Sequence, residues 1–205
     1  PRELGGYEAA GGHAATVAVA GNTAYVADRN WGLHAVSISD AARPARLGFY
    51  GPLGYADAVA VQGNYAYVAA ASYGLRVVDI SDPGRPRQVG IYDTESFATS
   101  VAVVGEYAYV GTTNPPDVRC GLHVVDVRDP TRPLRVGFLP GPVGTYRDMA
   151  VHNGVAYLAA EHGFQLIDVS SPASPKQLSH LILFERLGAD SGNAVGVAVK
   201  GTLAY

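Results

Sequence analysis

The sequence predicts an all-β fold, a β-propeller built from four-stranded antiparallel blades. Three observations lead to this prediction. The chain of 205 residues repeats itself about every 42 residues, each repeat contains four short apolar runs, and residues that favour turns separate these runs. A unit of this length leaves no room for a helix between its strands, which suits a propeller blade. A solenoid of β-coils is the less favoured alternative, because its repeats are normally shorter.

Recurrent prolines mark the boundaries of the repeats. They divide the chain into the units 1–43, 44–85, 86–132, 133–174 and 175–205. Four repeats are complete and the fifth is partial, so we expect a single β-propeller domain over 1–205 that is a fragment, incomplete at both ends. The remaining blades of the same polypeptide are then expected to pack against this segment. Their number stays open.

The four apolar runs of a unit are expected to form its four strands in chain order. The first run follows the pattern Val-Ala-Val and occurs at 17–19, 59–61, 101–103, 149–151 and 197–199. A turn of the Gly-Asn type separates it from an Ala-Tyr-Val run, which predicts a hairpin. The third run is apolar on both faces, as expected of a strand between neighbouring sheets. The fourth follows the second proline of the unit, and its Pro and Gly content suits an edge strand.

The third run ends in a repeated carboxylate. Asp79, Asp126 and Asp168 occupy this position in three of the units, and Ser37 replaces it in the first. We expect these carboxylates to accept hydrogen bonds from the turn that follows. A general acid and base pair among them is disfavoured, because equivalent residues of different blades lie far apart around the ring.

The third run and its turn read Leu-Arg-Val-Val-Asp-Ile-Ser-Asp-Pro at 75–83 and Leu-His-Val-Val-Asp-Val-Arg-Asp-Pro at 122–130. This pattern resembles the LVIVD-repeat family, a group of bacterial and archaeal β-propellers often found in secreted or surface proteins. The resemblance recurs in four units. It implies a repeat scaffold without shared catalytic residues and an extracellular or cell-surface location. The first unit departs from the pattern at Ser37 and Ala41, which loosens its turn.

Composition excludes several classes of protein. Hydrophobic residues make up 48% of the chain, charged residues 16%, and the formal net charge is −3. This argues against a disordered tail and a polybasic nucleic-acid arm, and no apolar stretch is long enough to insert into a membrane. The single cysteine, Cys120, cannot form an intrachain disulfide. The six histidines lack zinc-like spacing and no acidic calcium loop or glycine-rich phosphate loop occurs, so we expect no metal and no cofactor.

The connections between strands differ at the two ends of each sheet. Tight repeated turns join the first strand to the second and the third to the fourth. The other connections are longer and irregular, and together they form what we call the loop-rich face, where binding residues usually reside. Residues that break the repeat before the first strand are expected to ring the mouth of a central channel. They are Ala15, Asp57, Thr99, Arg147 and Val195, and, two positions earlier, His13, Tyr55, Phe97, Thr145 and Asn193.

The candidate binding residues come from this face. The polar candidates are His13, Asp57, Tyr146, Arg147 and Asn193, and the aromatic anchors are Trp31, Tyr55 and Phe97. The favoured function is a non-catalytic scaffold that binds a protein or glycan partner through this face. The alternative is a hydrolase or lyase at the channel mouth that uses Asp57, Arg147 and His13, since fold alone does not exclude enzymes. A third hypothesis is a spacer without any ligand.

Overall fold

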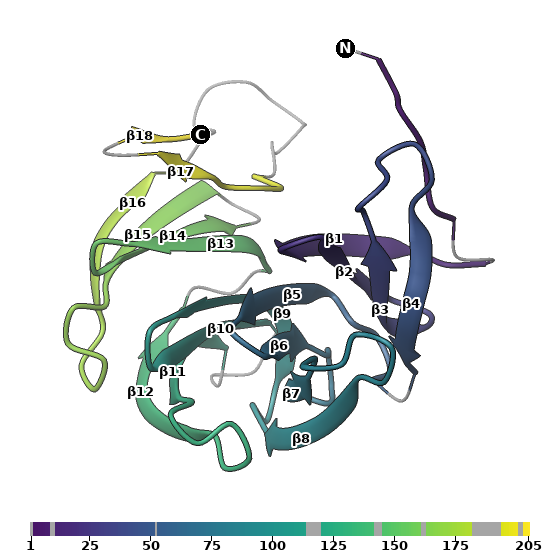
Figure 1. Ribbon diagram of the computed structural model, residues 1–205. Coiled ribbons are helices and arrows are strands. Elements are labelled where there is room, and N and C mark those ends of the chain that lie inside the picture. Colours follow the sequence, from purple (N-terminus) through teal and green to yellow (C-terminus); the bar gives the residue numbers. More distant parts are fainter. Residues whose placement is uncertain are drawn as a thin grey trace.

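The computed structural model describes residues 2–8, 11–51, 53–113, 120–141, 145–160, 163–181, 194–200 and 203–205. These residues form eighteen strands and no helix. The strands make four four-stranded sheets and one two-stranded sheet, arranged around a common centre in a ring that is not closed (Figure 1). Within the described ranges, no helix is long and apolar enough to cross a membrane. The predicted all-β blade architecture is confirmed.

Each sheet follows the chain order and pairs its strands antiparallel. Blade 1 contains β1 (Ala14–Ala20), β2 (Thr23–Asp28), β3 (Gly32–Ser37) and β4 (Ala45–Tyr50). Blade 2 contains β5 (Ala58–Gln62), β6 (Tyr65–Ala69), β7 (Leu75–Asp79) and β8 (Arg87–Tyr92). Blade 3 contains β9 (Phe97–Val104), β10 (Tyr107–Thr113), β11 (Gly121–Asp126) and β12 (Leu134–Pro140). Blade 4 contains β13 (Tyr146–His152), β14 (Val155–Ala160), β15 (Gly163–Asp168) and β16 (Lys176–Leu181), and β17 (Val199–Lys200) and β18 (Leu203–Ala204) form the small fifth sheet.

The first hairpin of each blade turns at the residues that the sequence singled out. Gly21, Gly63 and Gly105 have φ of 56°, 58° and 60° at the first turn position, which a type II′ turn requires. In blade 4 the order is reversed, and Asn153 and Gly154 both have positive φ, as in a type I′ turn. Both turn types match the right-handed twist of the strands, so they close two-residue hairpins.

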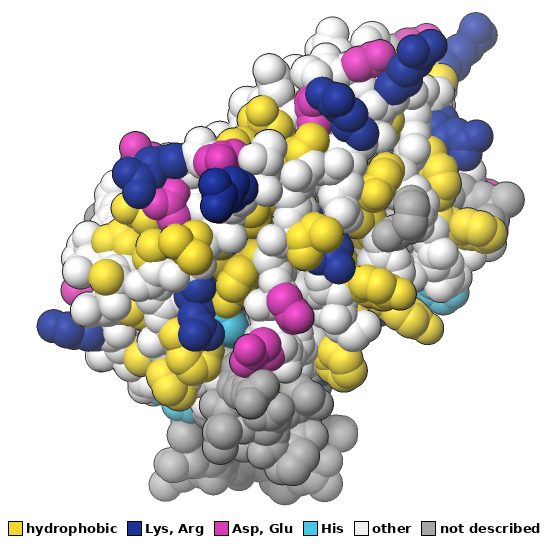
Figure 2. Space-filling view, turned by 90° about the horizontal axis from the view of Figure 1, so that it is seen from below, with side chains coloured by type: hydrophobic (Ala, Val, Ile, Leu, Met, Phe, Trp, Pro, Cys, Tyr) yellow, Lys and Arg dark blue, Asp and Glu magenta, His cyan; other side chains and the backbone are white. Residues whose placement is uncertain are grey.

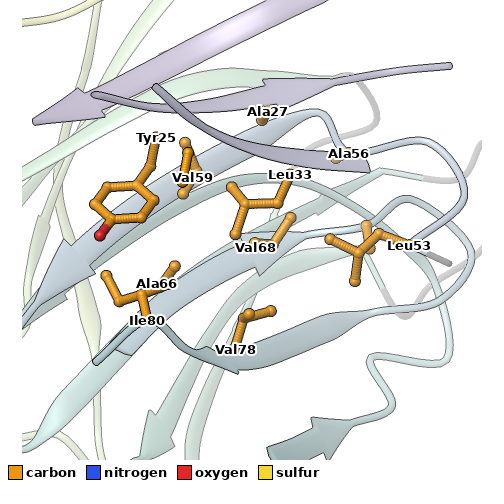
Figure 3. Close-up of a cluster of buried hydrophobic side chains, with 12 residues drawn as sticks. Tyr25, Ala27, Leu33, Leu53, Ala56, Val59, Ala66, Val68, Val78 and Ile80 are labelled. Carbon is orange, nitrogen blue, oxygen red and sulfur yellow. The ribbon is translucent and has the colours of Figure 1, made fainter. Parts of the chain in front are cut away.

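Neighbouring blades are held together by a repeated apolar core. Between blades 1 and 2, Tyr25 and Leu33 meet Val59, Val68 and further residues of the second sheet (Figure 3). Two equivalent clusters lie between blades 2 and 3 and between blades 3 and 4. The third strands β7 and β11 each contribute to the cores on both of their sides, which confirms that they are sandwiched between neighbouring sheets. Because each core joins two sheets, a blade depends on its neighbour for stability.

A glycine in the fourth strand lets each blade approach the next. Gly48, Gly90 and Gly137 lie against the carbonyl oxygens of Pro83, Pro130 and Pro172 in the following blade, where a Cβ atom would overlap the oxygen. The pairing between third and fourth strands shifts register beside each of these glycines, so every fourth strand is bulged. Close backbone approach therefore accounts for the repeated glycine.

A tyrosine of one repeat meets a buried histidine of the next. The Tyr92 hydroxyl lies 2.8 Å from Nδ1 of His123, and the Tyr7 hydroxyl lies 3.4 Å from Nδ1 of His34. His34 is 3% exposed, and burial lowers its pKa because the charged imidazolium would lose solvent. Both histidines are thus structural, in agreement with their equivalent positions in the repeat. Residues 2–8 therefore contact blade 1 as β8 contacts blade 3.

The repeated carboxylates cap the turns after the third strands. Oδ1 of Asp79, Asp126 and Asp168 accepts a hydrogen bond from the backbone N–H two residues later, at 2.9, 3.0 and 2.9 Å. In blade 1 the hydroxyl of Ser37 accepts the equivalent bond at 3.4 Å, which is longer, as expected of the looser turn. Positive and negative side chains lie side by side in Figure 2 rather than in a patch of one sign. The structural interpretation of these carboxylates is confirmed.

Asp79 provides a prediction about acid stability. Hydrogen bonds from Ser81, and then from Arg87, hold the pKa of Asp79 at about 2, below its ordinary value of 3.8. The ionised carboxylate therefore stabilises the fold above about pH 4, and this contribution is lost as the pH falls towards 2. We expect Asp79→Asn to flatten the fall in urea midpoint between pH 5 and pH 2.5. An equally steep fall in the variant would contradict this assignment.

Candidate functional site

The first strands of the blades surround a central cavity of about 830 Å³. Its lining includes all five residues that the sequence placed two positions before the repeated core: Ala15, Asp57, Thr99, Arg147 and Val195. Of the second set predicted at the channel mouth, Thr145 also lines this cavity, whereas His13, Tyr55 and Phe97 do not. Residues far apart in the chain are thus brought to one ring, which we call the channel mouth.

Local irregularity of the first strands creates this ring. In β1, β9 and β13 the register with the second strand shifts so that Ala15, Thr99 and Arg147 are the extra, unpaired residues. At the start of β5, the N–H of Asp57 donates to the carbonyl of Ala69, the residue that also pairs with Ala58. A β-bulge changes the direction of a side chain relative to the pleat. The bulges therefore explain why repeat-breaking residues of four blades reach the same cavity.

An ion pair between blades holds one part of the channel mouth. Nε of Arg29 lies 2.7 Å from Oδ1 of Asp57, and both residues line the cavity. Arg29 follows β2 directly, whereas Asp57 precedes β5. Sequence reasoning identified Asp57 but missed Arg29. The same search for repeat-breaking residues, applied to the connection after the second strand, would have found it.

Asp148 ties blade 4 to the segment that follows it. Its Oδ1 accepts a hydrogen bond from the N–H of Met149 and its Oδ2 accepts one from the N–H of Val197, both at 2.8 Å. Thr16 occupies the equivalent position in β1, and its hydroxyl accepts a bond from the N–H of Val59 in blade 2 at 3.0 Å. The position directly before the repeated core thus joins successive first strands. Asp148 also lines the cavity, but its oxygens are engaged with backbone.

Arg147 differs from the other charged residues of the channel mouth. Its side chain is exposed, and it forms no ion pair with the residues that the structure describes. Asp57 is occupied by Arg29, and Asp148 by two backbone amides. The guanidinium of Arg147 is therefore the part of this ring available to an anionic group from outside.

Exposed aromatic side chains lie on the same loop-rich face. Trp31, Tyr55 and Phe97 are 47%, 62% and 45% exposed. Tyr73, which sequence reasoning missed, is 51% exposed. Tyr73 precedes Gly74 and Leu75 just as Trp31 precedes Gly32 and Leu33. Alignment of the two repeats would therefore have identified Tyr73 as the equivalent of Trp31. All four residues lie in or at the end of connections from second to third or from fourth to first strands.

Tyr146 is not part of a binding surface, contrary to the sequence interpretation. It is 2% exposed and belongs to the core between blades 3 and 4, where burial raises its pKa to about 12. Its hydroxyl donates to Oε1 of Gln165 at 3.2 Å. Leu139 occupies the position in β12 that Tyr92 occupies in β8, and leucine has no hydroxyl group. The hydroxyl of Tyr146, from β13, is therefore the one that bonds to the buried Gln165.

Two candidates remain, of which the structure describes only His13. His13 is exposed and does not line the cavity; its carbonyl accepts a hydrogen bond from the N–H of Arg29 at 3.0 Å. Asn193 lies outside the described residues. In the described ranges, no cluster of three or more His, Cys, Asp or Glu side chains is placed to hold a metal ion. Of the trio Asp57, Arg147 and His13, the first two thus line the cavity and His13 does not.

Comparison with known proteins agrees with the geometry. The model of the LVIVD repeat matches residues 11–51, 53–94, 97–138 and 143–181. The crystal structure of the computationally designed Ika8 protein is similar with a TM-score of 0.68 and 12% identity, over 93% of this chain and 54% of Ika8, so the chain spans about half of that protein. The computationally designed Ika4 protein is similar with a TM-score of 0.65 and 12% identity, over 83% of this chain and 99% of Ika4. A comparison with curated protein sequences finds no match.

Proposed function

The chain belongs to the LVIVD-repeat family, and from this premise we propose that it is a non-catalytic binding scaffold which takes a protein or glycan partner on its loop-rich face. One observation carries the proposal. Four exposed aromatic side chains lie at the same end of the sheets as the channel mouth, whose Arg147 forms no ion pair with the residues that the structure describes. Tyrosine, tryptophan and arginine are the residues most enriched at the energetic centres of interfaces.

The distribution of repeated and unrepeated residues supports this proposal. At the opposite end of the sheets, Asp79, Asp126 and Asp168 are engaged in turns, and the neighbouring carboxylates Asp40, Asp82 and Asp129 each accept a backbone N–H two residues later. The turns at that end are therefore explained by folding. The exposed aromatic side chains Trp31, Tyr55, Tyr73 and Phe97 lie at the loop-rich face instead, and exposed apolar surface of this kind is a mark of interaction sites.

The hydrolase or lyase alternative has no comparable support. Asp57 is held by Arg29 at 2.7 Å, and His13 does not line the cavity that contains Asp57 and Arg147. A general acid or base must come within hydrogen-bond reach of the reacting group, directly or through one water. We therefore propose binding alone.

The proposal is tested by selecting ligands on the purified chain from a displayed peptide library and from a glycan array. We expect selected ligands to bind Tyr55→Ser or Trp31→Ser at least about tenfold more weakly, because such anchors dominate interface energies. Leu134→Ser is the matched control, since Leu134 is 67% exposed but lies on the outer strand β12. Biolayer interferometry measures the dissociation constants. Absence of any ligand from both libraries, or ligands lost only with Leu134→Ser, would overturn the proposal.

A further inference from the structure

The charges around the channel mouth are unevenly paired. Arg29 and Asp57 neutralise each other at 2.7 Å. Both oxygens of Asp148 accept backbone N–H groups, from Met149 and Val197. Among the described residues no acidic side chain is left to pair with Arg147, whose guanidinium has five N–H donors. Arg147 is therefore the cation of this ring that has no ion-pair partner among the described residues, next to an Asp148 carboxylate that backbone N–H groups hold in place.

Arg147 is placed where a ligand that enters the cavity can reach its guanidinium. Arg147 is the bulged residue of β13, and it lines the cavity while remaining exposed to solvent. The cavity is also lined by residues of the first strands, including Val59, Val101 and Met149, whose side chains are themselves buried. A volume of about 830 Å³ falls within the range of ordinary ligand sites. The site thus places a guanidinium at a cavity large enough for a ligand side chain.

We propose that the channel mouth is a carboxylate subsite, in which Arg147 receives an acidic side chain from a protein partner. This inference rests on the proposed binding function and names the chemistry of its ligand. A guanidinium binds a carboxylate through two parallel hydrogen bonds, and the cavity is large enough to take a glutamate side chain. A phosphate dianion fits less well, because the carboxylates of Asp57 and Asp148 line the same cavity and would repel its second charge.

The test is an NMR titration of the whole chain with N-acetylglutamate N-methylamide. The signal observed is the Nε–Hε group of Arg147, identified by its loss in Arg147→Gln. We expect a saturable shift of this signal and no comparable shift with the uncharged N-acetylglutamine N-methylamide. In Arg147→Gln, shifts of backbone amides in β9 and β13 should require about tenfold to hundredfold more ligand, because a charge-assisted bidentate contact is lost. Arg147→Lys should lie between, because it keeps the charge without the planar fork.

Arg87→Gln is the matched control. Arg87 is also exposed, but it is paired with Asp79 at 2.8 Å on the outer strand β8. Its loss should leave the titration unchanged. Equal binding of the glutamate and glutamine amides, or an unchanged titration in Arg147→Gln, would overturn the subsite. Tighter binding of inorganic phosphate or of glucuronate would assign the site to a different class of ligand and equally overturn it.

The outcomes separate this inference from the proposed function. Library ligands that depend on Tyr55 and Trp31 but carry no acidic group, and that bind Arg147→Gln normally, would leave the binding scaffold standing and remove the subsite. If the chain selects no ligand from either library but the NMR signal of Arg147 still shifts with the glutamate amide, the carboxylate subsite stands and the proposed scaffold function is overturned.

Discussion

Replacing Gly90 by alanine is expected to lower the free energy of unfolding by about 2–3 kcal/mol, the upper part of the range for overpacking. The added Cβ would overlap the carbonyl oxygen of Pro130 in the next blade, and backbone gives way less readily than a side chain. Without this contact the substitution would stabilise by about 0.4–1 kcal/mol, because alanine restricts the unfolded chain. Urea denaturation measures the free energy of unfolding of the variant. A decrease would show that β8 approaches Pro130 closely, and an increase would show that it does not.

Blade 4 supplies the control for this experiment. Ser179 pairs with Leu166 in β15 as Gly90 pairs with Val77 in β7, so the two positions are equivalent. Ser179 is exposed and already carries a side chain. We expect Ser179→Ala to change stability by less than about 0.5 kcal/mol, the usual range for surface substitutions. A neutral Gly90→Ala would show that the approach of β8 to Pro130 is not required.

Truncating Leu75 to alanine is expected to cost about 3 kcal/mol, within the range measured for buried leucines. Leu75 is fully buried in β7 and packs in the core between blades 2 and 3. Removing it leaves a cavity between two sheets whose backbones are fixed by their own ladders, so the site closes only partly. Thermal or urea unfolding of the variant measures the loss.

Leu134→Ala is the matched control for Leu75→Ala. The same atoms are removed, but Leu134 is 67% exposed on β12, so a change below about 0.5 kcal/mol is expected. Equal costs at the two positions would mean that the core between blades 2 and 3 does not stabilise the chain.

The channel mouth shows how repeat-breaking residues and repeated ones differ in role. Repeated side chains such as Asp79 and Gly90 are explained by turns and by the approach of neighbouring blades. Asp57, Thr99 and Arg147 share one position of the repeat but differ in chemistry, and they meet at one cavity. The residue at this position takes different roles in different blades, because Asp57 and Thr99 bond to neighbouring blades whereas Arg147 forms no ion pair with the described residues. The proposed carboxylate subsite uses that position.

The sequence alone determined the blade architecture and one of the two sets of residues predicted at the channel mouth, namely Ala15, Asp57, Thr99, Arg147 and Val195. Both follow from the sequence repeat, because each unit encodes its own hairpins, turn caps and alternation of buried and exposed side chains. The position of Arg147 or Asp57 within its blade could therefore be inferred without knowing any contact to another blade. The first strands all occupy the same place in their sheets. Because the sheets surround one axis, equivalent residues of the first strands come together around that axis.

Only the tertiary structure decided which side chains pair across blades. Tyr146 is buried because Leu139 in β12 leaves Gln165 without a tyrosine hydroxyl. Arg29 reaches Asp57 across 28 residues, and Asp148 reaches the N–H of Val197 across 49. Such contacts depend on the distance and angle between sheets, which no local pattern specifies. They decide that Asp57 is paired with Arg29 and Asp148 is bonded to backbone, whereas Arg147 forms no ion pair with the described residues.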